Sequence, residues 1–122
     1  MSQREEITTE VTDQYILAKL RCDELDEEHS FQIEDAIRAI AKKAARRPLI
    51  LDLSEVHQIP GESLGALVDL LHLCRDDGRR LMLAGLRPQV LEIMSLTKLG
   101  RLFEYRDDVG DALAHLNIED LG

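Results

Sequence analysis

Hydrophobic and polar residues alternate along the chain with two different periods, which divide it into short strands and amphipathic helices. Ile7 to Val11 and Tyr15 to Leu20 are rich in β-branched and apolar residues, and they flank the turn-forming triplet Thr12-Asp13-Gln14. This pattern predicts a β-hairpin. From Phe31 the period becomes that of an amphipathic helix, with apolar residues at Ile33, Ala36, Ile37, Ile40 and Ala44.

Charged residues flank this first helix in the order that the helix dipole favours. Acidic residues at positions 26–28 lie near its start, and basic residues at 42, 43, 46 and 47 crowd its end before Pro48. We therefore expect the helix to be stopped by this proline. The basic residues are interpreted as helix-end electrostatics rather than as an anion-binding site.

The second half of the chain repeats the alternation of strand and helix. The nearly continuous apolar run Leu49-Ile50-Leu51-Asp52-Leu53 predicts a strand that is buried on both faces and is therefore central in its sheet. Apolar spacing and the placement of Gly and Pro predict the remaining elements. These are helices beginning near 64, 88 and 109, and strands over 80–84 and 102–105.

The predicted order is strand, strand, helix, strand, helix, strand, helix, strand, helix. Such alternation requires right-handed crossovers and gives an α/β fold, with a single, mostly parallel mixed sheet on which the helices pack. The 122 residues contain no linker and no internal repeat, so we expect one domain over residues 1–122. A chain of this length buries a core without a disulfide or a structural metal.

The chain is acidic, with 15 Lys and Arg against 24 Asp and Glu and a formal net charge of −9. A nucleic-acid partner is not expected, because neutralising phosphates needs a clustered basic face. No apolar run has the length of a membrane span, so direct membrane insertion is not expected. The polar, acidic start lacks the basic and apolar regions of a signal peptide, which predicts a cytoplasmic location.

Residues able to bind metals are scattered along the sequence. Cys22 and Cys74 have no second Cys or His at ligand spacing, and the four histidines form no i, i+4 pair. We therefore expect no metal site and no cofactor, and we interpret both cysteines as packing thiols. No residue is assigned a catalytic role, so the protein is not expected to be an enzyme.

One loop is favoured as the functional region. Ligand and partner sites in open α/β sheets form where the carboxyl ends of strands meet helix N-termini. This rule points to residues 54–64, where Ile59 and Pro60 would supply apolar contact, Gly61 close backbone approach, and Glu62 a charge for a cationic group. The residues expected to bind a partner are Gln58, Ile59, Pro60, Gly61, Glu62, Ser63 and Leu64.

Five segments, in their order and spacing, resemble the STAS domain, the fold of bacterial anti-sigma factor antagonists. The resemblance extends over nearly the whole chain, and it implies the STAS fold, in agreement with the element order derived above. The segments are Asp52-Leu53-Ser54, Leu64-Gly65-Ala66-Leu67, Gly78, Pro88-Gln89-Val90 and Leu99 to Phe103.

The resemblance also implies a function. Family members of this type bind an anti-sigma factor that is itself a serine kinase, and phosphorylation of a Ser or Thr at the start of the second helix switches that binding. Aligning Ile59 and Leu64 with the family motif places Pro60 at its Asp, Gly61 at its phosphorylated residue and Ser63 at its Gly. The acceptor hydroxyl is absent. The expected partner is an anti-sigma factor of the serine-kinase type, or another STAS-binding protein, bound without the usual switch.

Two nearby hydroxyls are alternative acceptors. Ser63 or Ser54 is a possible displaced phosphoacceptor, although a serine at a helix start is more often an N-cap that bonds backbone N–H groups. Glu62 adds a negative charge beside Gly61, and it either replaces phosphate in part or simply suits the positive end of the helix. We favour a binding module that is not switched at Gly61.

Three other functions match parts of the sequence. Gly61-Glu62-Ser63-Leu64-Gly65 fits a hydrolase nucleophile elbow with Ser63 as nucleophile and His115 downstream, but the predicted strand ends too early. Asp52 is placed like the acceptor of a receiver domain, but the acidic pair of that fold is missing, and a loop-anchoring carboxylate is the alternative. STAS domains also occur as cytoplasmic parts of transporters, and a scaffold in a stress complex is a related possibility.

Overall fold

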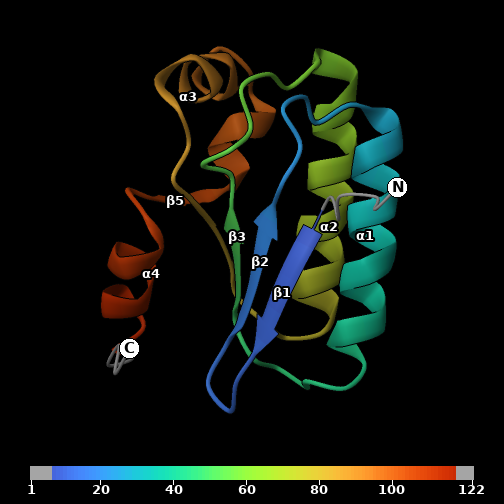
Figure 1. Cartoon of the computed structure of the whole chain (residues 1–122), viewed down its shortest axis with the longest axis vertical. Coiled ribbons are helices and arrows are strands. Elements are labelled where there is room, and N and C mark those ends of the chain that lie inside the picture. Colours follow the sequence, from blue (N-terminus) through green and yellow to red (C-terminus); the bar gives the residue numbers. More distant parts are fainter. Residues whose placement is uncertain (1–6, 118–122) are drawn as a thin grey trace, which may run out of the picture.

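The computed structural model describes residues 7–117 (Figure 1). It contains five strands, four α-helices and two short 3₁₀-helices in this part of the chain. In chain order they are β1 (Ile7–Val11), β2 (Ile16–Leu20), α1 (Glu27–Ala41), β3 (Leu49–Asp52), η1 (Gly61–Ser63), α2 (Leu64–Asp76), β4 (Leu81–Ala84), α3 (Pro88–Ser95), η2 (Leu99–Leu102), β5 (Glu104–Arg106) and α4 (Val109–His115).

The strands form one mixed sheet in the order β1-β2-β3-β4-β5. β1 and β2 are antiparallel, with Ile7 opposite Leu20, and the other three pairings are parallel. The predicted α/β class, the mostly parallel sheet and the alternation of strands and helices are confirmed. β3 is central, and its first three residues are completely buried, as the apolar run from Leu49 predicted.

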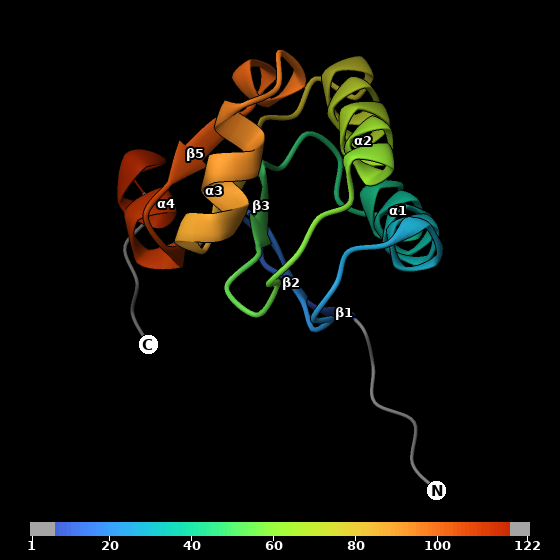
Figure 2. The same cartoon turned by 90° about the horizontal axis from the view of Figure 1, so that it is seen from above.

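Helices cover the two faces of the sheet unequally. α1 and α2 cover one face, and α4 packs against β3, β4 and β5 on the other (Figures 1 and 2). The larger core, under α1 and α2, joins strand residues such as Leu51 to Ile37 and Leu70, whereas the smaller one joins Ile50 and Met82 to α4. α3 lies above the edge where the parallel strands end, beside the loop that the sequence favours (Figure 1).

Helix α1 begins at Glu27, before the predicted start at Phe31, because Asp26 caps it. An Asp26 Oδ1 atom accepts a hydrogen bond of 2.9 Å from the backbone N–H of His29 and lies 2.7 Å from the ring Nδ1 of the same residue. The backbone hydrogen bond from His29 is the largest influence, and together with the ring it lowers the pKa of Asp26. The cap adds a polar first turn that the apolar period alone does not reveal.

The end of α1 corrects the sequence prediction. The helix ends at Ala41 rather than near Pro48, so the basic residues at 42, 43, 46 and 47 lie in the following turns. The buried guanidinium of Arg79 donates to the Ala41 carbonyl at 3.0 Å and to the Arg47 carbonyl at 2.9 Å. A distant side chain therefore satisfies one orphan carbonyl at the end of α1 and also binds the backbone that leads into β3.

The last strand also lies later than predicted. Leu102 belongs to η2, and β5 begins at Glu104 rather than at 102. The 3₁₀ turn is tight because Gly100 packs directly against the end of α3. A Cβ atom on Gly100 would lie 1.9 Å from the carbonyl oxygen of Met94. The backbone becomes extended at the buried Phe103, directly before β5.

Glu104 on β5 is the acceptor of a small charged cluster. The Arg80 guanidinium donates to it at 2.5 and 2.8 Å, and Arg106 donates at 2.6 Å. Burial raises the pKa of the Glu104 carboxyl, but the hydrogen bonds from the two arginines outweigh that effect and hold the pKa below its ordinary value of 4.5. The carboxylate therefore contributes to stability only in its charged form.

A Glu104→Gln variant is expected to lose about 1–2 kcal/mol of unfolding free energy at pH 7. Because the folded pKa is depressed, the stabilisation is complete above the ordinary value of 4.5 and is lost as the pH falls through the folded pKa. The unfolding free energies of variant and wild type, measured in urea, should therefore converge as the pH is lowered below 4.5. Glu92→Gln, at an exposed position on α3, is the control. If the loss of unfolding free energy in Glu104→Gln were the same at acid pH as at pH 7, the prediction would be contradicted.

Candidate functional site

Residues 54–64 lie at the carboxyl-terminal edge of the sheet, between β3 and α2 (Figure 1). Their backbone is bound to the loop between β2 and α1. Glu24 and Gln58 form a short parallel bridge, the Leu25 N–H donates to the Gln58 carbonyl at 2.9 Å, and the His57 N–H donates to the Asp23 carbonyl at 2.7 Å. Two loops that are distant in sequence thus form one surface.

The start of the loop is fixed from both sides. The Ser54 N–H donates to Asp52 Oδ1 at 2.9 Å, and the Ser54 carbonyl accepts from the Arg87 guanidinium at 2.9 Å. Gly85, with a φ of +73°, allows the loop after β4 to come close, since a Cβ there would lie 3.2 Å from Asp52 Oδ1. Asp52 therefore anchors the loop. This role was the alternative to its interpretation as the phosphate acceptor of a receiver domain.

The seven residues expected to bind a partner divide into two sets. We call Gln58, Pro60, Gly61 and Glu62 the exposed set, and the other three the inner set. Gln58, Gly61 and Glu62 are exposed and Pro60 is half-buried. Ile59, Ser63 and Leu64 belong to the inner set, with at most 3% of their surface exposed. Ile59 packs into the core beneath the loop, so little of the apolar surface expected to contact a partner is exposed.

Ser63 does not perform the capping role expected of it. It stands before α2 in helical conformation, with φ −79° and ψ −13°, and its side chain makes no capping hydrogen bond. The hydroxyl is buried and has no hydrogen-bond partner, because η1 has already begun the helical turn at Gly61. The acceptor geometry of an N-cap needs an extended backbone that this residue does not have.

The nucleophile-elbow interpretation of Ser63 does not fit the structure. An elbow places its serine on a sharp turn directly after a strand, whereas η1 and a long loop separate Ser63 from the end of β3 at Asp52. His115 lies in α4, on the opposite face of the sheet, where its Nε2 is 2.9 Å from Arg106. The two residues therefore form no catalytic pair.

Gly61 is the exposed first residue of η1, at the N-terminal end of the helical segment that continues as α2. A Cβ atom on it would meet nothing within 4 Å, and its backbone lies outside the left-handed region. Neither space nor backbone conformation therefore requires glycine here. A side chain at this position would project from the surface beside Glu62.

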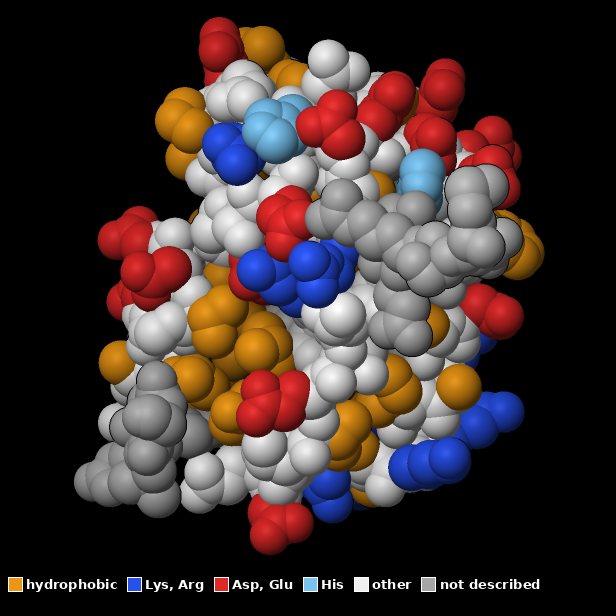
Figure 3. Space-filling view, in the orientation of Figure 1, with side chains coloured by type: hydrophobic (Ala, Val, Ile, Leu, Met, Phe, Trp, Pro, Cys, Tyr) orange, Lys and Arg blue, Asp and Glu red, His pale blue; other side chains and the backbone are white. Residues whose placement is uncertain are grey.

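An open depression of about 600 Å³ adjoins this exposed set, between the two loops and α3. Asp23 Oδ1 lies 2.6 Å from His57 Nδ1 at its rim. Acidic side chains gather at this end of the molecule, over the upper ends of α1 and α2 (Figure 3). The depression is thus lined in part by apolar residues and has carboxylates around it. The lining residues are Glu24, His57, Gln58, Ile59, Pro60, Gln89 and Ile93.

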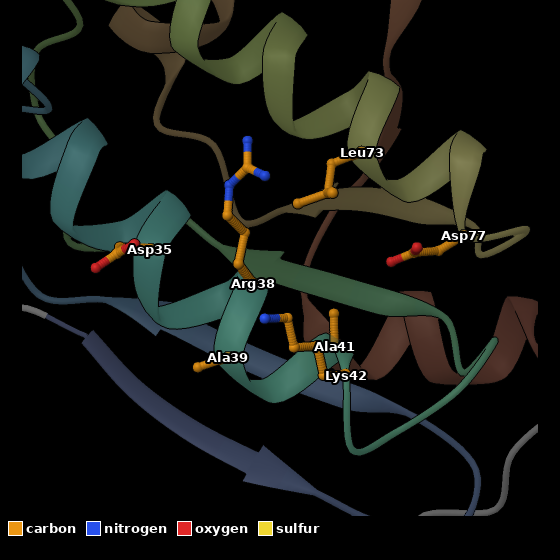
Figure 4. Close-up of a pocket in the computed structure, with 7 residues that line it drawn as sticks. All are labelled: Asp35, Arg38, Ala39, Ala41, Lys42, Leu73 and Asp77. Atoms are coloured by element: carbon orange, nitrogen blue, oxygen red, sulfur yellow. The ribbon is translucent and has the colours of Figure 1, made fainter.

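A second hollow, of about 400 Å³, lies between α1 and α2, away from the loop. Figure 4 shows Arg38 of α1 extending toward Leu73 of α2, with Asp35 and Asp77 at the two ends. The opposite charges around it, and the hydrogen bond of 2.7 Å that holds Arg38 on Glu34, favour a solvated helix groove over a ligand site.

Neither cysteine has the features of a reactive thiol. Cys22 and Cys74 are buried and unbridged, and burial raises the pKa of the Cys74 thiol to about 11. Within residues 7–117 no group of three or more His, Cys, Asp or Glu side chains is arranged to hold a metal ion. No helix in this part of the chain has both the length and the apolar composition needed to cross a membrane.

Comparison with protein-family models matches residues 7–112 to the STAS domain. The chain belongs to the STAS domain family. The match begins with β1 and ends within α4, so it includes the whole sheet and the loop of residues 54–64. The family suggested by the five sequence segments is therefore confirmed.

Solved structures share the STAS fold over most of this chain. An anti-sigma-factor antagonist (STAS) domain protein from Planctomyces limnophilus has a TM-score of 0.78 at 18% identity, covering 93% of this chain and 99% of that one. The anti-sigma factor antagonist SpoIIAA in its unphosphorylated form has a TM-score of 0.73 at 17% identity, with the same coverage. The murine anion transporter Slc26a9 has a TM-score of 0.74 at 17% identity, covering 84% of this chain but 18% of that one.

Part of this STAS surface comes from outside the loop and was not predicted from the sequence. Asp23 and Glu24 follow β2, and Gln89 and Ile93 come from α3, yet all four adjoin the loop. The sequence did indicate that Asp23 and Glu24 would lie beside the loop. Parallel neighbouring strands end at the same edge, so the polar residues after β2 are expected beside those after β3.

Proposed function

We propose that this STAS protein is a regulatory binding protein that engages an anti-sigma factor of the serine-kinase type through the exposed set Gln58, Pro60, Gly61 and Glu62, and that it is not switched at Gly61. The observation that carries the proposal is the place of Gly61. Gly61 is exposed at the start of the helical segment. The resemblance to the family aligns it with the phosphorylated residue, and glycine has no hydroxyl to accept a phosphate. The proposal includes no catalysis, and it places the protein in the cytoplasm.

The alternative acceptors receive little support from their surroundings. Only 1% of the Ser63 surface is exposed, so a kinase would reach its hydroxyl only after η1 opened. Ser54 is half-buried, and its backbone is held by Asp52 on one side and Arg87 on the other. Both hydroxyls are therefore less accessible than a side chain at the exposed Gly61 would be. We therefore favour binding without modification.

The charge of the surface indicates the chemistry of the partner. Glu62 and Glu24 are exposed, and 78% of the Asp23 side chain is accessible. A partner that presents Arg or Lys at the depression would pair with these carboxylates, while Pro60 and Ile93 supply apolar contact. The binding should therefore weaken as the salt concentration rises, because the carboxylates are exposed to solvent.

The direct test uses the purified protein and the purified serine kinases of the anti-sigma type from the same genome, with ATP. Complex formation is measured by size-exclusion chromatography, and phosphate incorporation by intact mass. We expect a complex without a gain in mass. A gain of one phosphate that disappears in Ser63→Ala or Ser54→Ala would show that the acceptor has moved. Absence of any complex would contradict the proposal.

Gly61→Arg is expected to weaken this complex at least about 30-fold, because a long cation would stand at the centre of the contact surface. The fold should be unaffected, since a side chain at 61 enters open space. Calorimetric titration with the kinase measures the loss. Ala39→Arg, exposed on the far half of α1, is the matched control and should bind like the wild type. Equal affinities for the two variants would refute the placement of the site.

A second candidate function follows from the similarity to Slc26a9, an anion transporter whose STAS-like part is a small share of its length. In that case this chain would serve as the regulatory subunit or scaffold of a membrane complex. Affinity purification of the tagged protein from its own cells separates the candidates. Recovery of a membrane transporter in place of a soluble serine kinase would favour this second function.

A further inference from the structure

The 3₁₀-helix η2 and its flanks present three different faces. A 3₁₀-helix has three residues per turn, so residues three apart lie above one another. Gly100 and Phe103 point inward and are buried. Leu99 and Leu102 form an outer apolar row, each about 40% exposed, and the exposed Lys98 and Arg101 form a basic row beside it.

The end of α3 extends the apolar row. Leu96, which directly follows α3, is 79% exposed, and Leu91 within α3 is 45% exposed. The same stretch is basic on an acidic molecule: residues 87–102 contain Arg87, Lys98 and Arg101 against Glu92, a net charge of +2 within a chain of −9. We call Leu96, Lys98, Leu99, Arg101 and Leu102 the leucine-basic surface.

Helix α1 carries the complementary surface. Phe31 is 74% exposed, an unusual position for an aromatic ring, and the exposed acidic residues Glu27, Glu28 and Asp35 share its side of the helix. A hollow of about 260 Å³ lies beside the ring, lined by Phe31, Glu34, Asp35 and Arg38. We call Glu27, Glu28, Phe31 and Asp35 the Phe31 surface. It offers an exposed aromatic ring beside a hollow lined by charged side chains, and three carboxylates.

The two surfaces cannot meet within one molecule. α2 contacts both α1 and η2 and lies between them, so each surface faces away from the other (Figure 2). We propose that they meet between two molecules: the leucine-basic surface of one copy binds the Phe31 surface of a second copy. Leucine side chains would cover Phe31, and Lys98 and Arg101 would approach the acidic residues of α1.

Such a contact is head-to-tail, because each molecule uses a different surface on its two sides. Assemblies of this kind either close into rings or grow as filaments. The contact is small and rich in charge, so a weak association that decreases with salt is expected. Self-association is tested with this protein alone, so its failure is distinguishable from failure of the partner proposed above.

Sedimentation velocity of the full chain tests the proposal, at protein concentrations up to about 0.5 mM and in low and high NaCl. The wild type should associate at low salt, and Phe31→Ser or Leu96→Ser should each weaken association at least about 10-fold. An equimolar mixture of the two variants should form dimers and nothing larger, because each variant retains one intact surface. Val11 is another exposed apolar residue, 46% accessible but on β1, and Val11→Ser should behave as the wild type.

Three outcomes would overturn the proposal. The first is a wild type that stays monomeric at low salt, which would leave the leucine-basic surface to a different acidic partner. The second is a mixture of Phe31→Ser and Leu96→Ser that associates no better than either variant alone. The third is loss of association in Val11→Ser, which would place the contact at the edge of the sheet.

Discussion

Gly100→Ala is expected to destabilise this protein by about 3 kcal/mol or more, a large effect for the addition of one methyl group. The new Cβ would lie 1.9 Å from the carbonyl oxygen of Met94 and 2.6 Å from its carbonyl carbon. Backbone atoms cannot move aside as a side-chain tip does, so η2 must separate from the end of α3. Urea unfolding measures the loss in free energy.

Two other glycines are matched controls for this substitution. A Cβ on Gly61 or on Gly65 meets nothing within 4 Å, and neither residue has a positive φ. Gly65→Ala should even stabilise α2 by about 0.5–1 kcal/mol, because alanine loses less backbone entropy in a helix. Equal stability of Gly100→Ala and Gly61→Ala would show that η2 moves away from α3 without cost.

Element types were predictable where a repeating pattern determines them. The apolar run from Leu49 identified a buried central strand, since only a strand covered on both faces has no polar side. The ends of elements were less predictable, because distant residues decide them. Arg79 bonds the last carbonyl of α1, and the contact of Gly100 with Met94 delays β5 until Glu104. Neither of these two contacts can be recognised from the residues next to the end of the element.

The candidate site shows the same division. The gathering of its loops was predictable from topology alone, since residues after parallel strands gather at one edge of the sheet. The orientation of its side chains did not follow, because the sequence does not reveal that η1 forms before α2. That extra helical turn directs Ser63 and Leu64 inward and leaves Gly61 and Glu62 outside. Of the seven residues expected to bind a partner, Ile59, Ser63 and Leu64 are therefore buried.

Gly61→Ser is expected to create the missing switch. The new hydroxyl would be exposed at the start of η1, with open space around its Cβ. A kinase that binds the wild type without modifying it should then transfer one phosphate to residue 61. The phosphate adds about −1.5 to −2 charge beside Glu62, in a contact surface that is already acidic. Affinity for the kinase should fall at least about 10-fold after phosphorylation.

Gly65→Ser distinguishes a true acceptor position from any exposed serine on this helix. Its side chain would also be exposed and unhindered, about one turn further along, and intact mass should show no phosphate on it. The resemblance to the family motif aligns Pro60 with its Asp, so Pro60→Asp combined with Gly61→Ser should be modified at least as fast. If neither variant gains phosphate from a kinase that binds both, Gly61 does not occupy the acceptor position, and the lack of a switch has another cause.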